Sequence, residues 1–225
     1  MSLPIQNLNQ GDPRFGDIVM APSKLKIRNF GCLATAILDT FPVYQIQMDP
    51  VTYFNKLVSV GGFDPEGNLN HTAIEKIDPN LVFYERVYTT NSKSQSQKML
   101  VSAAIDRARS LLSLGQPVML EVDNVGNDGR GDHWLCASDF KAGDKPDFLV
   151  SNPDGGKMHW FSERYGDPQK GLHGLYCILG PSQFFPDGTS RDRQQMGLAA
   201  WKAAMVWSGK SVPTYSKEIL SALLG

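Results

Sequence analysis

Cys32 is the residue of this sequence best suited to nucleophilic chemistry. It follows Gly31 at the start of an apolar segment whose spacing predicts a helix. The unpaired N–H groups and the dipole at a helix N-terminus favour an anion, and therefore a thiolate. Glycine beside the thiol allows a substrate or another backbone to approach closely, so Gly31 is a candidate substrate-binding residue. A free cysteine is also commonly a small buried hydrophobic side chain, and this context alone leaves both interpretations open.

A thiol nucleophile needs a base, and histidine is the usual partner. His133 opens a segment with a strong strand pattern and follows a glycine-rich loop. A residue at the mouth of a strand beside such a loop is well placed to face a cleft. The other three histidines lie in a polar loop or in or near predicted strands, so we expect His133 to be the base. Trp134, the next residue, could shield a thiolate–imidazolium pair from water and is the second candidate substrate-binding residue.

Two further positions could complete a catalytic site. Asn152 follows His133 by 19 positions, at the end of the next predicted strand, so a hairpin would return its amide to the level of the imidazole. Asp154 in the same turn is the alternative orienting residue, and Asn-Pro-Asp-Gly is also ordinary turn sequence. An oxyanion needs N–H donors, which the Cys32 backbone and the side-chain amide of Gln10 could supply.

The elements that must position these residues follow from apolar periodicity and from turn residues. Helices are predicted from 29 to the break at Pro42, from 49–50 to the break at 61–62, near 72–77, and over 94–114. Strands are predicted at 81–88, 117–122, 133–140, 148–151, 158–161 and 172–179. Helices thus dominate the first half and strands the second, which indicates an α+β fold with an antiparallel sheet packed against a helical half.

The composition excludes several classes of protein. The 225 residues carry 22 Lys+Arg and 23 Asp+Glu, and this balance argues against a basic nucleic-acid-binding protein. No apolar run approaches the roughly 18 residues of a membrane helix, and no signal-peptide pattern precedes the first elements. We therefore expect a soluble protein that binds neither nucleic acid nor membrane, and that is cytoplasmic or leaves the cell by a route without a signal peptide. Three cysteines without zinc-site spacing lead us to expect no metal and no cofactor.

The chain is predicted to comprise a main domain over 1–180 and a C-terminal extension over 181–225. The extension is polar at first and then shows two amphipathic helical patterns, at 194–207 and 216–224. Such a segment could dock on the main domain or on a protein partner.

Several segments, taken in order, resemble the papain-like cysteine peptidases, in particular the bacterial branch similar to the peptidases that cleave bacteriocin leaders and to their phage relatives. The matching segments are Gln10 through Phe15, Phe30-Gly31-Cys32 through Ala36, Asp49-Pro50 through Leu57, Gly61 through Asn70, Gly115-Gln116-Pro117-Val118, His133-Trp134, and Asn152-Pro153 through Gly155. The resemblance covers about residues 5–180.

This resemblance implies a papain-like fold with Cys32 as nucleophile, His133 as base, Asn152 as orienting residue and Gln10 as oxyanion donor. Asn152 departs from the branch, which more often has Asp there, and the departure keeps Asp154 in consideration. The implied activity is that of a thiol hydrolase acting on a peptide or isopeptide bond, with peptidoglycan-type peptides or a protein leader as substrates. Two alternatives stay open: a non-catalytic module of the same fold, for example in a phage particle, and an acyl transferase using the same residues.

Overall fold

The computed structural model describes residues 2–78, 81–123, 131–141, 143 and 145–180. The chain divides between Gly180 and Pro181 into two units. The second unit lies outside the described residues, and with it the helices predicted at 194–207 and 216–224.

The described residues form eight helical segments and seven strands. The helices are α1 (Ile27–Phe30), α2 (Cys32–Asp39), α3 (Pro50–Ser59), the 3-10 turn η1 (His71–Ala73), α4 (Ile74–Ile77), α5 (Val101–Ser113), α6 (Phe161–Tyr165) and α7 (Pro168–Gly171). The strands are β1 (Val82–Thr89), β2 (Lys98–Met99), β3 (Val118–Val122), β4 (His133–Lys141), β5 (Asp147–Asn152), β6 (Lys157–Trp160) and β7 (Gly174–Leu179).

All seven strands belong to one sheet, in the order β2-β1-β7-β3-β4-β5-β6. Every neighbouring pair is antiparallel except β1 and β2, which are parallel. The last strand of the chain, β7, lies between β1 and β3, so it joins the early strands to the later ones. The predicted α+β class with a largely antiparallel sheet is confirmed.

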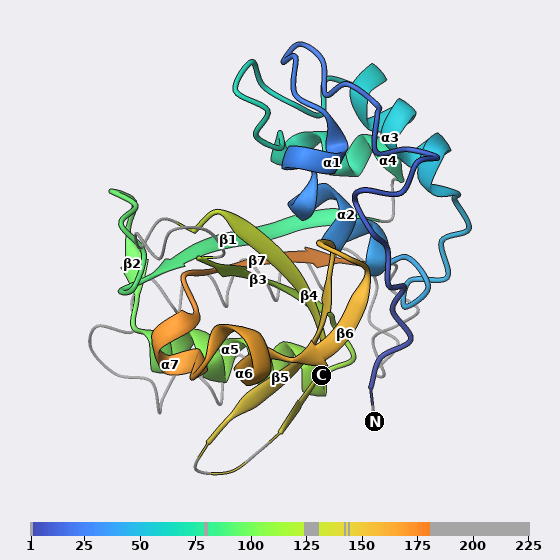
Figure 1. Cartoon of the computed structure of the whole chain (residues 1–225). Coiled ribbons are helices and arrows are strands. Elements are labelled where there is room, and N and C mark those ends of the chain that lie inside the picture. The colour runs from blue at the N-terminus through green and yellow to red at the C-terminus, as the bar shows by residue number, and fades with distance from the viewer. Residues whose placement is uncertain (1, 79–80, 124–130, 142, 144, 181–225) are drawn as a thin grey trace, which may run out of the picture. The chain divides into compact units, whose positions relative to one another are not determined.

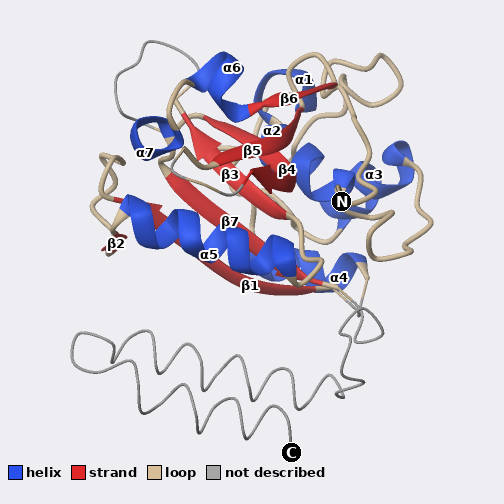
Figure 2. Ribbon diagram, turned by 90° about the horizontal axis from the view of Figure 1, so that it is seen from below, coloured by secondary structure: helices blue, strands red, loops and turns tan. Residues whose placement is uncertain are grey.

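The sheet separates two groups of helices. Figure 1 shows α1 to α4 on one side of the sheet and α5 to α7 on the other. Figure 2 shows α5 lying along β7 and β1. Helix α2 packs on the sheet against β3, β4 and β5, and α4 contacts β1. All residues of α2 are buried, because its polar positions as well as its apolar ones are enclosed between the sheet and the other helices.

The helix predicted from 29 to Pro42 is split into α1 and α2, so that prediction was wrong in detail. The backbone N–H of Gly31 donates to the Ile27 carbonyl and closes α1, and the Gly31 carbonyl accepts from Thr35 N–H and opens α2. A side chain at residue 31 would collide with Ile27, since an added Cβ would lie 2.7 Å from its carbonyl oxygen. The break therefore depends on glycine, and it makes Cys32 the first residue of a new helix.

Helix α3 begins where the sequence predicts. The Asp49 side chain accepts a hydrogen bond from Thr52 N–H, and Pro50 occupies the first helical position. The short predicted helix near 72–77 is present as η1 followed by α4.

Other predicted boundaries need correction. The helix predicted over 94–114 begins only at Val101, because Lys98 and Met99 pair with the end of β1 as the short strand β2. The strand predicted at 158–161 ends at Trp160, and Phe161 begins α6. Neither α6 nor α7 was predicted, since each is a single short turn of helix with little periodicity to detect.

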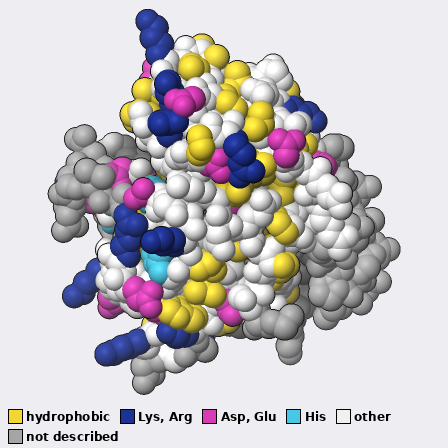
Figure 3. Space-filling model, turned by 45° about the vertical axis from the view of Figure 1, so that its right-hand side comes forward, with side chains coloured by type: hydrophobic (Ala, Val, Ile, Leu, Met, Phe, Trp, Pro, Cys, Tyr) yellow, Lys and Arg dark blue, Asp and Glu magenta, His cyan; other side chains and the backbone are white. Residues whose placement is uncertain are grey.

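Figure 3 shows that positive and negative side chains are interspersed on one face of the molecule. This distribution agrees with the near balance of charge in the sequence. Among the residues that the structure describes, no helix is both long enough and apolar enough to cross a membrane.

Candidate active site

Cys32 lies at the N-terminus of α2 and lines a cavity of about 460 Å³ together with His133 and Trp134. The residue is 9% exposed. Its Sγ is within hydrogen-bonding reach of the backbone N–H groups of Trp134, of Leu33 and of Cys32 itself. The thiol is therefore held where the first turn of α2 meets the first residues of β4, and it can be reached from the cavity.

The electrostatics around the thiol act in two directions. Burial raises the pKa of the Cys32 thiol to about 11, and the negative charge of Asp132 contributes to the rise, while the three backbone N–H groups lower it. Burial dominates, because removing the thiolate from water costs more than three N–H contacts return. In the free protein Cys32 is thus a neutral thiol at neutral pH.

His133 is oriented by Asn152. The two side chains are buried, and His133 Nε2 lies 2.7 Å from Asn152 Oδ1. An amide oxygen only accepts hydrogen bonds, so Nε2 must carry the proton and Nδ1 of the neutral ring keeps its lone pair. Burial lowers the pKa of His133, and the hydrogen bond to Asn152 opposes this shift. In the neutral ring, the contact with Asn152 therefore places the proton on Nε2 and makes Nδ1 the basic nitrogen.

Asn152 is itself held in one orientation. Its Nδ2 donates to Tyr165 Oη at 3.2 Å, and its Oδ1 accepts a second hydrogen bond from Asp154 N–H at 2.9 Å. Asp154, the alternative orienting residue, directs its carboxylate to Arg164 at 2.9 Å. Of the two candidates, Asn152 is the one in contact with the imidazole, while the negative charge of Asp154 raises the pKa of His133 without that contact.

Gln10 lines the same cavity as Cys32. Its backbone N–H donates to the Pro153 carbonyl, and its Nε2 donates to the Arg28 carbonyl at 2.9 Å. An amide nitrogen has two hydrogens, so one donor of Gln10 holds the side chain in place and one is left for a ligand. Its Oε1 is buried and has no partner among the described residues.

The two predicted substrate-binding residues are placed differently. Trp134 is buried on the cavity wall and supplies a backbone N–H to the thiol. Gly31 instead permits the close approach of Ile27 of α1, where a side chain would collide. Its structural role is to start α2 at Cys32, which fits the predicted close approach of another backbone, while contact with substrate stays a prediction.

The lining of the cavity is mixed. On the side of the helices it includes the apolar side chains of Phe30, Leu33 and Leu69 and the polar side chains of Asn29, Glu66 and Asn68, and Phe30 is 54% exposed. On the side of the sheet it is lined by Trp134 and by an ion pair between Arg86 and Glu121. An elongated ligand with both apolar and charged groups would match these walls.

The sequence reasoning missed Arg86, Glu121 and Tyr165. Glu121 gave a signal that was not used, since it is the one charged residue in the otherwise apolar segment Val118–Val122. Arg86 and Tyr165 gave none, because their roles depend on which strands and helices become neighbours.

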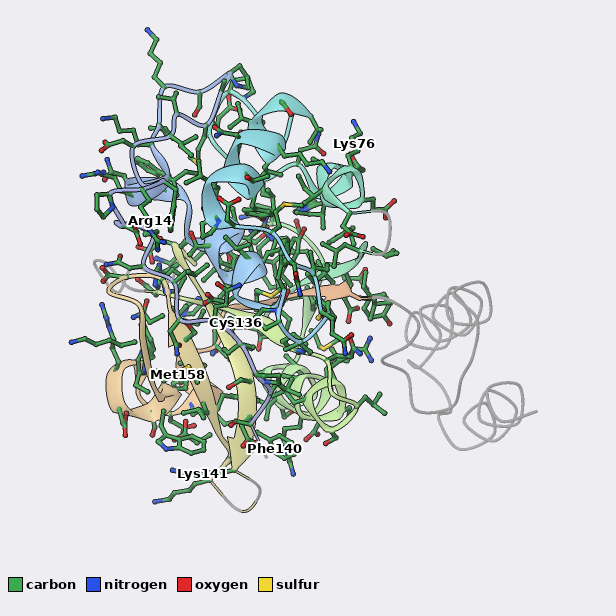
Figure 4. The ribbon with its side chains drawn as sticks, turned by 90° about the vertical axis from the view of Figure 1, so that its right-hand side faces the viewer. Arg14, Lys76, Cys136, Phe140, Lys141 and Met158 are labelled. Carbon is green, nitrogen blue, oxygen red and sulfur yellow. The ribbon has the colours of Figure 1, made fainter. Side chains whose placement is uncertain are left out.

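All three cysteines are free, and Cys136 and Cys177 are almost completely enclosed. Figure 4 shows Cys136 in the interior of the molecule. Burial raises the pKa of both thiols strongly. They therefore serve as internal references for the reactivity of Cys32.

Neither the chemistry of the described side chains nor the comparisons with known proteins assign a cofactor. Among the described residues, no group of three or more His, Cys, Asp or Glu side chains is arranged to hold a metal ion. No family model, curated protein or solved structure matches the chain significantly.

Proposed function

We propose that this protein is a thiol hydrolase of papain-like type, which cleaves a peptide or isopeptide bond through a thioester on Cys32. The observation that carries the proposal is the 2.7 Å contact between His133 Nε2 and Asn152 Oδ1, because it leaves Nδ1 free as a base on the cavity that Cys32 also lines. A buried histidine with only a structural role has no need of this combination.

The first step begins from the neutral thiol. His133 Nδ1 accepts the proton of Cys32 as Sγ attacks the carbonyl carbon of the scissile bond. The carbonyl oxygen becomes an oxyanion, which the Cys32 backbone N–H and the second N–H of the Gln10 amide stabilise. The C–N bond then breaks as His133 returns the proton to the leaving amine, and a thioester remains.

The second step releases the acyl group. His133 Nδ1 removes a proton from a water molecule, and the resulting hydroxide attacks the thioester. The S–C bond breaks, the sulfur takes up the proton, and the product is a carboxylic acid. Asn152 keeps the proton on Nε2 throughout, as an orienting residue rather than a reacting one.

The substrate class rests on the resemblance described above and on the shape of the cavity. A cavity lined by apolar, polar and charged side chains suits a peptide, and peptides of the bacterial cell wall or a protein leader are the candidates. The segment 181–225 could contact a protein partner.

The proposal is tested by labelling with thiol-directed peptide electrophiles, with modified residues identified by mass spectrometry. At pH 7 we expect Cys32 to be modified rapidly and Cys136 and Cys177 to stay unmodified in the folded protein. His133→Ala should slow the labelling of Cys32 by orders of magnitude. Lys76→Gln, a change at the surface of α4 (Figure 4), is the control and should label like the unaltered protein.

Slow labelling of Cys32 that does not change in His133→Ala would contradict the proposal and favour a non-catalytic module. If the activity is confirmed, product analysis separates hydrolysis from acyl transfer. Hydrolysis incorporates oxygen from labelled water into the product, whereas a transferase forms a product that contains an added amine.

A further inference from the structure

We propose that Arg86 forms a specificity subsite for a carboxylate group of the substrate, next to the thiol and imidazole. This inference rests on the proposed function, because it assigns the ligand chemistry of one wall of the same groove. The occupant would be a peptide with an acidic side chain or a free terminal carboxylate close to the scissile bond.

The sheet creates the subsite by bringing four strands into register. Glu121 of β3 lies opposite Trp134 of β4 on one side and opposite Gly174 of β7 on the other, and Gly174 lies opposite Tyr88 of β1. These four residues form one row across the sheet. Because Gly174 has no side chain, Arg86 of β1 can reach across β7 to Glu121, and Arg86 Nη2 lies 3.2 Å from Glu121 Oε1.

Gly174 is essential to this arrangement. A Cβ added there would lie 2.4 Å from Glu121 Oε2 and 2.9 Å from the Val87 carbonyl oxygen. Gly131 leaves similar space on the other side, since a Cβ at that position would lie 2.4 Å from Glu121 Cδ. Two glycines therefore enclose the carboxylate of Glu121 and fix it as the anchor of Arg86.

The guanidinium of Arg86 is also held by aromatic rings. Its Cζ lies 4.8 Å from the centre of the Tyr88 ring and 5.2 Å from that of Trp134. Its Nε–H is buried and has no partner among the described residues. A carboxylate can bind a guanidinium through two parallel hydrogen bonds, so a ligand carboxylate would pair with the part of the Arg86 side chain that is exposed to the cavity.

The exposed fractions of the two side chains show which member of the Arg86–Glu121 ion pair a ligand can contact. The side chain of Arg86 is 26% exposed, whereas that of Glu121 is 2% exposed. A cationic ligand would need access to Glu121, which is enclosed, while an anionic ligand needs access to Arg86, which lines the groove. Of the other acidic residues on the same cavity, Asp154 is already paired with Arg164, and Glu66 and Asp132 are exposed to solvent.

Arg86 also stands where two cavities meet. A second cavity, of about 390 Å³, shares Arg86, Glu121 and Gly131 with the first and continues toward residues 92–95. Lys93 contributes a second positive charge to its lining. The two cavities together therefore continue beyond Cys32 and past Arg86. A residue in this position would contact the part of a peptide substrate that lies next to the scissile bond.

The experiment compares matched pairs of peptide electrophiles, by their second-order rate constants of Cys32 labelling. In the first set, Glu or Gln is placed in turn at each of three positions before the electrophile. This set tests whether an acidic side chain of the peptide is preferred. In the second set, a peptide Michael acceptor carries either a C-terminal carboxylate or a C-terminal carboxamide beyond the electrophile. This set tests whether a free terminal carboxylate is preferred. The ratio of acid to amide rates cancels general changes in the reactivity of the thiol.

In the unaltered protein we expect at least one acid probe to react roughly tenfold faster than its amide partner. Arg86→Gln should abolish that preference. Glu121→Gln should increase it, because Arg86 then loses its compensating charge. The double variant Arg86→Gln/Glu121→Gln leaves no lone buried carboxylate to disturb folding, and it should also lack the preference. Lys76→Gln removes one positive charge elsewhere and should keep the ratio unchanged.

The outcomes separate the two proposals. Peptide labelling of Cys32 without acid preference, or a preference that survives in the double variant, overturns the subsite and leaves the thiol hydrolase standing. If no peptide electrophile labels Cys32 in a His133-dependent way, the proposed function is overturned and the subsite with it.

Discussion

The Nε2 atom of His133 and the Oδ1 atom of Asn152 are 2.7 Å apart, and the Asn152 amide is fixed in turn by Tyr165 and by the backbone of Asp154. This relationship determines the tautomer of the imidazole. It leaves Nδ1 without the proton, and under the proposed function the reactivity of Cys32 depends on how Asn152 holds the imidazole.

Two substitutions of Asn152 distinguish its role in orienting the His133 imidazole from the effect of a negative charge at this position. Asn152→Ala removes the acceptor of Nε2–H and should lower the rate of Cys32 labelling on the order of 10²-fold, because the ring is then free to rotate and to change tautomer. Asn152→Asp keeps an acceptor and adds a negative charge, so it should retain labelling and raise the pKa of His133. The acid limb of the pH–rate profile should therefore move to higher pH in Asn152→Asp.

Tyr165→Phe is the control for these changes, since it removes only the outer hydrogen bond and should have a small effect. Equal losses in Asn152→Ala and Asn152→Asp, with no movement of the acid limb, would show that Asn152 matters only for packing.

The pH dependence of labelling should reveal general-base catalysis. Burial raises the pKa of Cys32 to about 11 and lowers that of His133 below its usual 6.5. Between these values both groups are neutral, so the rate with iodoacetamide should be nearly constant from pH 7 to 9 and should fall only as His133 is protonated. In His133→Ala the base is absent, and the rate should increase about tenfold per pH unit toward pH 11, following the thiolate fraction.

Measurement of the same rates in heavy water provides a second readout. Proton transfer during attack should make the unaltered protein slower in heavy water at pH 8. A preformed thiolate–imidazolium pair would instead give little isotope effect, and that result would contradict the neutral resting state.

Gly31→Ala should disrupt the junction between α1 and α2. The added Cβ would meet the Ile27 carbonyl oxygen and Cγ2, each at 2.7 Å, so the backbone must shift. We expect a loss of about 1–3 kcal/mol in the free energy of unfolding, measured with urea, and slower labelling of Cys32. Gly11→Ala is the matched control, because its Cβ would meet only the Asn9 side chain, at 3.2 Å. Similar stability of the two variants would argue against the proposed need for glycine at residue 31.

Asp39 should make the protein less stable as the pH rises. Its carboxyl group, at the end of α2, accepts hydrogen bonds from Leu8 N–H and Ser151 Oγ–H, yet burial raises its pKa from 3.8 to about 8. The folded state therefore binds a proton that the unfolded state releases between about pH 4 and pH 8. Over this range the group lowers the stability, by roughly 6 kcal/mol at most, and above pH 8 the effect levels off.

Asp39→Asn keeps a neutral hydrogen-bonding group and should remove this contribution. The difference in unfolding free energy between Asp39→Asn and the unaltered protein should be small near pH 4 and should favour the variant increasingly up to pH 8. Ser151→Ala removes a contact that lowers the carboxyl pKa, so it should extend the decline to higher pH. A difference independent of pH would refute the assignment of a protonated Asp39.

Much of the local structure could be predicted from the sequence because its signals are local. Apolar periodicity identified α3 and β1, and the Asp49-Pro50 pair marked the start of α3 within one residue. The same signals failed where tertiary contacts override periodicity. Residues 98–99 pair with β1 instead of extending α5, and one predicted apolar helix is split at Gly31 by contact with Ile27.

By itself, the sequence determined the candidate residues Cys32, His133 and Asn152, because each stands at the predicted start of a helix or strand or in a turn and because the ordered segments around them resemble one family. Only the tertiary structure decided that Asn152, rather than Asp154, contacts the imidazole, and that Arg86 and Glu121 meet beside the thiol. The physical reason is that these contacts depend on strand register and on β7 lying between β1 and β3. Such pairings between distant segments are set by the packing of the whole sheet, and no short stretch of sequence encodes them.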